Sequence, residues 1–194
     1  THYQEKIESS DILKKLDLRS KDYFVVSCHR EENVDVDSRL SKLVDVLNYL
    51  ARDLGKIVKV STHPRTRKQF DKGGFKLSEN VHLIKPLNFT DYIQLQKNSI
   101  AVLSDSGTIT EESSILNLHA LNIRDTHERP EGMEEGAVMM TGLELPAIAN
   151  ALEILNNQHT MGKERLFKIV GDYKANNVSD KVVRIIISHI DFVN

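Results

Sequence analysis

Short apolar segments alternate with longer amphipathic segments along most of the chain. The short segments are rich in Val, Ile, Leu and aromatic residues, which is typical of strands buried in a parallel sheet. They cover residues 23–28, 57–61, 81–84, 100–103, 118–123 and 137–140. Because helical segments separate these strands, the pattern predicts an α/β fold, a Rossmann-like, doubly wound parallel sheet with helices on both faces.

The amphipathic segments predict the helices. Apolar residues recur at helical spacing from Leu40 to Leu54, and Gly55 ends that pattern. Asn88 is expected to open another helix, and residues 124–132 are expected to form a loop. The remaining helices are predicted near residues 3–16 (one or two helices), 65–70, 105–116, 146–156 and 179–193.

Length and composition favour one globular domain. The 194 residues are 40% hydrophobic and 28% charged, which is enough for one core. The 26 basic and 28 acidic residues give a net charge of −2 without a basic stripe, so nucleic acid is not an expected partner. No apolar run reaches the roughly 20 residues that span a bilayer, so no membrane is expected either.

The single cysteine and the first residue also bear on the kind of protein. Cys28 has no second cysteine to pair with inside the chain, which favours a cytoplasmic location. The chain begins at Thr1 without a methionine, and we therefore expect a fragment or a processed chain.

The chemically distinctive residues directly follow predicted strands. The carboxyl ends of parallel strands meet at one edge of a sheet, and ligands of such folds bind beyond that edge. We therefore expect these residues to lie together. They are His29, Arg30, His63, Arg65, Ser106, Gly107 and Arg129.

The turn that follows residues 100–103 is a candidate phosphate site. A helix start offers backbone N–H donors and the positive end of the helix dipole, and Gly107 lets an anion approach the main chain. Asp105 or Ser106 is expected to cap the helix, and Glu111 and Glu112 are candidates for hydrogen bonds from sugar hydroxyls. Ordinary turn chemistry explains the same residues equally well.

The cationic side chains favour a phosphate or diphosphate ligand. Arginine and histidine form charge-assisted hydrogen bonds with phosphate oxygens. Tyr92 or Phe89 could stack on a base, although Phe89 is expected in the core. A metal site of His29, His63 and His127 lacks a recognised ligand spacing, and neighbouring arginines disfavour a cation. No dinucleotide-binding or Walker motif is present, which argues against a dehydrogenase or a P-loop enzyme.

Four motifs together resemble those of the non-hydrolysing UDP-N-acetylglucosamine 2-epimerase family, in order and approximate spacing from residue 23 to 142. They are His29-Arg30-Glu31-Glu32-Asn33, Ser61-Thr62-His63-Pro64, Asp105-Ser106-Gly107 with Glu111-Glu112, and Arg124-Asp125-Thr126-His127-Glu128-Arg129-Pro130-Glu131. The resemblance implies the C-terminal, UDP-binding half of a two-domain GT-B fold. Residues 1–22 would be a linker or N-terminal helical segment and residues 23–194 the domain, the N-terminal domain being absent.

The resemblance also implies a reaction and roles for residues. The family inverts C2 of a UDP-HexNAc by anti elimination of UDP to a 2-acetamidoglycal and re-addition of UDP, without a cofactor. The residues that it implies near the reacting bond are His29 and Arg129. Those that it implies in UDP binding are Arg30, His63, Tyr92, Ser106, Gly107, Thr108 and Glu112.

The carboxylates that handle the proton belong to the family's N-terminal domain, so the resemblance implies that this chain alone is inactive. UDP, a UDP-HexNAc and the missing N-terminal domain are the implied partners, and the full-length form is expected to be a homodimer. Glu31 and Thr108 depart from the arginine and glycine of many members, and Glu31 puts an allosteric substrate site in doubt.

Three other functions stay open. The motif variants, together with the tail from Asp172 to Val183, are most similar to the capsule and O-antigen branch, which 2-epimerises a UDP-2-acetamido-2,6-dideoxy-L-talose to UDP-L-FucNAc. The second alternative is the donor domain of a GT-B glycosyltransferase. A non-catalytic nucleotide-sugar sensor is the third.

Overall fold

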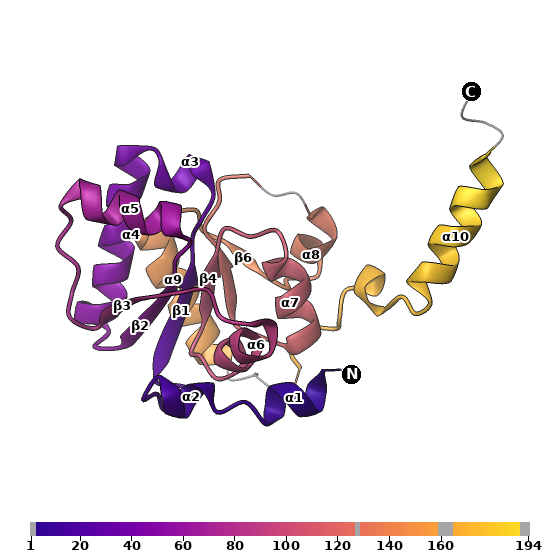
Figure 1. The fold of residues 1–194 in the computed structure, drawn as a ribbon, viewed down its shortest axis with the longest axis horizontal. Coiled ribbons are helices and arrows are strands. Elements are labelled where there is room, and N and C mark those ends of the chain that lie inside the picture. The colour runs from indigo at the N-terminus through magenta and orange to yellow at the C-terminus, as the bar shows by residue number, and fades with distance from the viewer. Residues whose placement is uncertain (1–2, 127–128, 159–164, 191–194) are drawn as a thin grey trace.

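Six parallel strands form one sheet in the order β3-β2-β1-β4-β5-β6 (Figure 1). The computed structural model describes residues 3–126, 129–158 and 165–190. Its strands are β1 Tyr23–Ser27, β2 Ile57–Ser61, β3 Val81–Ile84, β4 Val102–Ser104, β5 Ala120–Asn122 and β6 Met139–Met140. β1 and β4 are the central pair. β2 and β3 lie on one side of this pair, and β5 and β6 lie on the other side. The predicted doubly wound α/β fold is confirmed.

Helices cover both faces of the sheet, as Figure 1 shows. On one face, Phe24 and Val26 of β1 pack into a core with α4, α5 and α9. On the other face, Tyr23 and Val25 pack with α2, α6 and α7. The α-helices are α1 Gln4–Glu8, α2 Ile12–Lys15, α3 Glu31–Val34, α4 Asp37–Asn48, α5 Pro64–Gly73, α6 Phe89–Lys97, α7 Ile109–Leu116, α8 Pro130–Glu134, α9 Leu145–Gln158 and α10 Val178–His189.

The observed helices differ from the predicted ones in two short helices that were not predicted and in where some helices begin and end. α3 and α8 were not predicted, and α8 lies where a loop was expected, because four or five residues are too few to show a helical period. α4 continues as a π-helical turn, Tyr49–Asp53, and a 3-10 turn at Gly171–Lys174 precedes α10. The part of the predicted last helix beyond residue 190 lies outside the described residues.

The N-terminal segment packs along α6. Ile12 is only 3% exposed and belongs to the second core, and the Ser10 hydroxyl donates to the Asp91 carboxylate on α6. Tyr3 meets Phe89 edge to face, with ring centroids 5.5 Å apart. Phe89 is nevertheless 59% exposed, so its predicted place in the core is wrong. It begins α6 at the surface, where the N-terminal segment covers only part of its ring.

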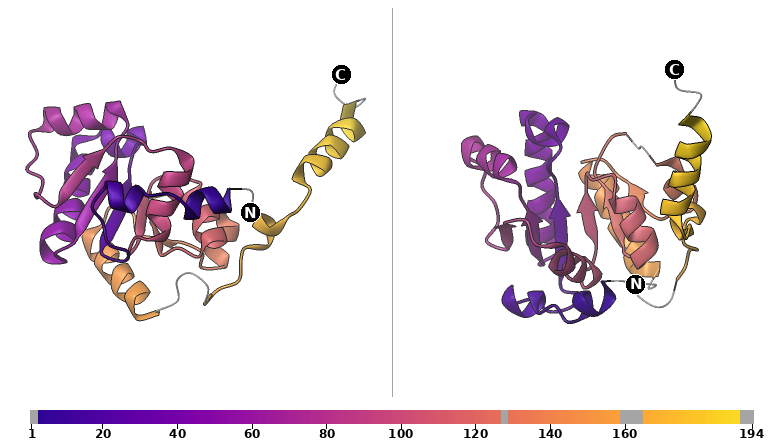
Figure 2. Two further views of the ribbon diagram at one scale, coloured as in Figure 1. Left: turned by 60° about the horizontal axis from the view of Figure 1, so that its bottom comes forward. Right: turned by 45° about the vertical axis from the view of Figure 1, so that its right-hand side comes forward.

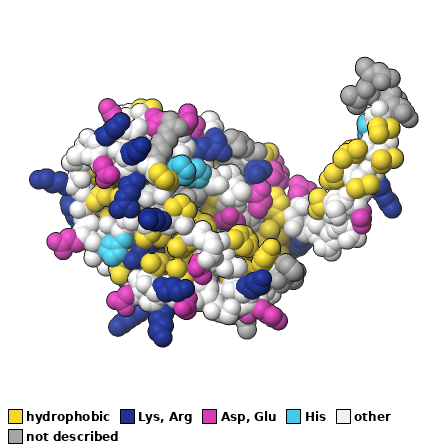
Figure 3. Space-filling model, in the orientation of Figure 1, with side chains coloured by type: hydrophobic (Ala, Val, Ile, Leu, Met, Phe, Trp, Pro, Cys, Tyr) yellow, Lys and Arg dark blue, Asp and Glu magenta, His cyan; other side chains and the backbone are white. Residues whose placement is uncertain are grey.

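Helix α10 projects from the body of the protein, as both views of Figure 2 show. Its apolar side chains form a continuous yellow surface in Figure 3. The large apolar residues exposed on it and just after it are Val178, Val182, Val183, Ile185, Ile186, Ile187 and Ile190. Among the described residues, no helix has the length and apolarity needed to cross a membrane.

Candidate functional site at the carboxyl edge of the sheet

Asp105 joins the ends of the two central strands. It follows β4 directly, and none of its surface is exposed. Its Oδ2 accepts hydrogen bonds from the backbone N–H of His29 at 3.0 Å and of Arg30 at 2.9 Å. The same oxygen accepts from Nδ2 of Asn33 and Sγ of Cys28, each at 3.2 Å. One buried carboxylate therefore fixes the loop that follows β1 against the turn that follows β4.

Because its carboxylate binds this loop, Asp105 does not cap α7. The N-cap residue is Thr108, whose own side chain makes no capping hydrogen bond, while the Ser106 hydroxyl accepts from the Thr108 N–H at 3.4 Å. The Ser106 hydroxyl lies 2.9 Å from the Thr108 hydroxyl, and Ser106 N–H donates to the Ser104 hydroxyl at 3.1 Å. Neither Asp105 nor Ser106 is therefore the N-cap residue, although the Ser106 hydroxyl accepts a hydrogen bond from a backbone N–H of this turn.

Arg30 and Arg129 both donate to backbone carbonyl groups of the same turn. Arg30 Nε donates to the Asp105 carbonyl oxygen at 3.2 Å. Arg129, the N-cap residue of α8, donates from Nε to the Gly107 carbonyl oxygen at 3.1 Å. Its Nη2 lies 2.9 Å from Oε1 of Glu111. Both guanidinium groups thus lie beside the start of α7, where an anion would benefit from the helix dipole.

A second group of polar residues lies where α6 meets α7. Gln96 Nε2 donates to Glu112 Oε2 at 2.8 Å. Burial raises the pKa of Glu112, and hydrogen bonds from Gln96 and Thr108 oppose that rise. Burial also raises the pKa of Tyr92 to about 12, against a hydrogen bond with Ser27 at the end of β1. Tyr92 and Glu112 therefore flank the same edge as Asp105.

His63 is exposed at the junction of β2 and α5. The first turn of α5 is close to the Asp105 cluster, because Thr66 Oγ1 donates to the Cys28 carbonyl oxygen at 3.4 Å. The Arg65 side chain and all of His127 lie outside the described residues. Within the described ranges, no group of three His, Cys, Asp or Glu residues is arranged to hold a metal ion.

The structure thus brings most of the predicted site residues to one edge. They are His29, Arg30, Tyr92, Ser106, Gly107, Thr108, Glu112 and Arg129. The sequence did not single out Asn33 or Gln96, both fully or nearly fully buried, as partners of the site carboxylates. Helical spacing offered one signal, since Gln96 follows Tyr92 by one turn of α6.

Helix α8 packs against α7 without room for a side chain. A Cβ added at Gly132 would lie 1.9 Å from Cγ2 of Thr110. Gly132→Ala is therefore expected to reduce the free energy of unfolding by about 1 to 3 kcal/mol, measured by denaturant titration. Thr110→Ser removes the contacting methyl group and should restore most of that loss in the double variant.

Gly171→Ala is the matched control for this contact. A Cβ at Gly171 meets no atom within 4 Å, so the change should be neutral or slightly stabilising. A Gly132→Ala protein as stable as the wild type would contradict the close packing of α8 on α7.

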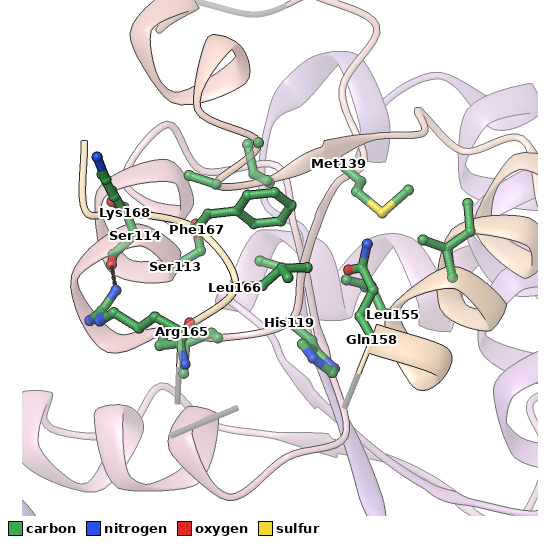
Figure 4. A pocket seen from close by; sticks show the side chains of 17 residues that line it. Ser113, Ser114, His119, Met139, Leu155, Gln158, Arg165, Leu166, Phe167 and Lys168 are labelled. Atoms are coloured by element: carbon green, nitrogen blue, oxygen red, sulfur yellow. Dashed lines mark hydrogen bonds between the residues drawn. The ribbon is translucent and has the colours of Figure 1, made fainter. Parts of the chain in front are cut away.

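The cavity in Figure 4 lies at the other end of α7 and contains none of these site residues. Arg165 borders it and donates to the carbonyl oxygens of Ser114 and Ile115, at 2.7 and 2.6 Å. Arg165 thereby satisfies carbonyl groups in the last turn of α7. The cavity, of about 210 Å³, is lined largely by apolar residues such as Leu155, Leu166 and Phe167.

The fold and the edge around Asp105 define a Rossmann-like α/β domain with a polar site at the carboxyl ends of its strands. A family model described as UDP-N-acetylglucosamine 2-epimerase matches residues 1–187. A curated UDP-N-acetylglucosamine 2-epimerase of Methanocaldococcus jannaschii is 35% identical over 143 residues, which cover 71% of this chain and 38% of that protein. The chain belongs to the UDP-N-acetylglucosamine 2-epimerase family.

Solved structures agree with this membership. The UDP-N-acetylglucosamine 2-epimerase of Rickettsia bellii has a TM-score of 0.87 and 39% identity, and the match covers 100% of this chain and 51% of that chain. The M. jannaschii enzyme in complex with UDP-GlcNAc and UDP has a TM-score of 0.80 and 28% identity, covering 95% of this chain and 50% of that chain. The region matched by this chain is therefore about half of each solved chain. In the sequence comparison, the matched region is 38% of the curated M. jannaschii protein.

Proposed function

We propose that this chain is the UDP-binding, C-terminal half of a non-hydrolysing UDP-N-acetylglucosamine 2-epimerase. The observation that carries the proposal is the cluster around Asp105, which gathers His29, Arg30 and Arg129 beside the start of α7. A relative of the same fold was solved with UDP-GlcNAc and UDP bound. Cationic side chains and a helix N-terminus favour the same class of ligand, a nucleoside diphosphate.

The proposed chemistry follows from the charge that develops on UDP. Elimination breaks the C1–O bond and leaves negative charge on the departing diphosphate. Arg129 and His29 would stabilise that charge, and because it is larger in the transition state than in the bound substrate, their effect is on the rate as well as on binding. Glu112 would accept hydrogen bonds from the ribose, and Tyr92 would contact the uracil.

The other half of the protein is part of the proposal. The carboxylates that remove and return the C2 proton would lie on that half, so this chain alone is expected to bind UDP weakly and turn over nothing. Its solved relatives are about twice as long as this chain. We propose that the missing half covers the exposed apolar face of α10. We also propose that the full-length protein is a homodimer. Its proposed place of action is the cytoplasm, on precursors of polysaccharides.

The sugar is the least constrained part of the proposal, because the sugar pocket would be shared with the missing half. A relative from Pseudomonas aeruginosa, 33% identical over 126 residues, is a UDP-2,3-diacetamido-2,3-dideoxy-D-glucuronate 2-epimerase. Sugars therefore differ among the relatives of this chain. UDP-GlcNAc is our first candidate, and the talose derivative that gives UDP-L-FucNAc is the alternative.

Solvent deuterium tests the reaction. The full-length protein, incubated with UDP-GlcNAc or the talose derivative in D₂O, is expected to incorporate deuterium at C2 of the sugar, measured by mass spectrometry and NMR. A glycosyltransferase would instead pass the sugar to an acceptor and leave C2 protonated. Absence of C2 deuterium with every UDP-HexNAc tested would overturn the epimerase proposal.

A further inference from the structure

Residues 165–174, which we call the strap, follow α7 from its last turn toward its first. Arg165 binds carbonyl oxygens in the last turn of α7, and Val170 N–H donates to the Ser114 hydroxyl at 3.0 Å. Figure 4 shows Arg165 to Lys168 lying against this part of the helix. The strap then continues to the 3-10 turn Gly171–Lys174, which packs beside α7. It therefore contacts the helix that begins at the proposed diphosphate site.

Tyr173 connects the far end of the strap to α8. Its hydroxyl donates to Oε1 of Glu131 at 2.8 Å. Burial raises the pKa of Tyr173, as do the carboxylates of Glu131 and Glu111, while the charge of Arg129 lowers it. Tyr173 thus lies within electrostatic reach of both partners of the Arg129–Glu111 ion pair.

Contacts of α8 and of the Arg129 side chain place Arg129 beside the start of α7. Glu131 is the second residue of α8 and follows Arg129, the N-cap residue, by two positions. Gly132 packs against Thr110 of α7, which fixes the distance between the two helices. At the side chain, Glu111 and the Gly107 carbonyl oxygen hold the guanidinium group. The bond from Tyr173 to Glu131 therefore acts on the backbone that presents Arg129.

We propose that Tyr173 is a positioning residue for Arg129, through which the strap sets the geometry of the diphosphate site. The inference rests on the proposed function, since it assigns Arg129 to the diphosphate. The Tyr173 hydroxyl bonds to Glu131, which belongs to α8 and not to the turn from Ser106 to Thr108. Its effect on a ligand would consequently pass through Arg129.

Tyr173→Phe tests this role. The variant is expected to bind UDP about 3- to 10-fold more weakly than the wild-type chain in calorimetry, the range associated with one hydrogen bond. Glu131→Ala breaks the same bond from the other side and should give a similar loss that does not add to that of Tyr173→Phe. Tyr49→Phe, a change on the π-helical turn after α4, is the control and should leave UDP affinity unchanged.

A double-variant cycle separates positioning from a general structural role. In an Arg129→Ala background, Tyr173→Phe should cause no further loss of UDP affinity. The inference is overturned if Tyr173→Phe and Glu131→Ala bind UDP like the wild type, or if their losses persist without Arg129. Failure of the proposed function gives a different result, because the wild-type chain itself would then not bind UDP.

Discussion

Asp105→Ala is expected to lower the free energy of unfolding by about 3 kcal/mol, because several buried donors would lose their acceptor at once. The backbone N–H groups of His29 and Arg30, and Nδ2 of Asn33, all donate to this carboxylate. For a chain of 194 residues the loss corresponds to a decrease in Tm of about 6 to 12 °C. Thermal unfolding followed by circular dichroism measures it.

The same substitution should also remove UDP binding where the chain remains folded, since the loop that carries His29 and Arg30 is no longer held to the end of β4. Asp45→Ala, at an exposed position of α4, is the matched control and should change the free energy of unfolding by less than about 0.5 kcal/mol. Equal stability of the Asp105→Ala and Asp45→Ala chains would contradict the role assigned to the buried carboxylate.

Arg129→Ala is expected to weaken UDP binding by about 10- to 100-fold, because hydrogen bonds to charged groups contribute more than neutral ones. The guanidinium group is only partly exposed and is already held at the Gly107 carbonyl oxygen and Glu111. Little side-chain entropy should therefore be lost when a diphosphate binds. Calorimetric titration of the chain with UDP measures the effect.

Arg52→Ala provides the comparison for Arg129→Ala, since it removes the same charge from the π-helical turn after α4, away from the carboxyl edge. Its UDP affinity should match that of the wild type at moderate salt, where distant charges are screened. Arg129→Lys should recover only part of the affinity, because an ammonium group cannot reproduce the planar contacts of a guanidinium. Similar affinities of the Arg129→Ala and Arg52→Ala chains would contradict the assignment of Arg129.

The sequence predicted the sheet well because burial on both faces leaves a direct signal. Each predicted strand overlaps an observed one, and β2 and β3 agree at both ends. The helices that were not predicted, α3 and α8, have only four and five residues. The predicted burial of Phe89 was wrong because phenylalanine is buried on average, and the residue type does not tell which neighbours cover a particular side chain.

The site was predictable in its location and less so in its internal contacts. Ligands of parallel sheets bind beyond the carboxyl ends of the strands, and this rule predicted that His29, Ser106 and Arg129 lie at one edge. It could not reveal that the Asp105 carboxylate accepts from the amides of the neighbouring loop and does not cap α7, because those amides are more than seventy residues away in sequence. The link from Tyr173 to Glu131 spans 42 positions and left no local pattern either.

Titration of the ¹⁵N-labelled chain with UDP, followed by amide NMR shifts, tests the central assignment most directly. We expect the largest shifts at residues 105–112, with further shifts at residues 29–30 and at Arg129. Shifts concentrated around the cavity of Figure 4 or along α10, or no shifts at millimolar UDP, would contradict it.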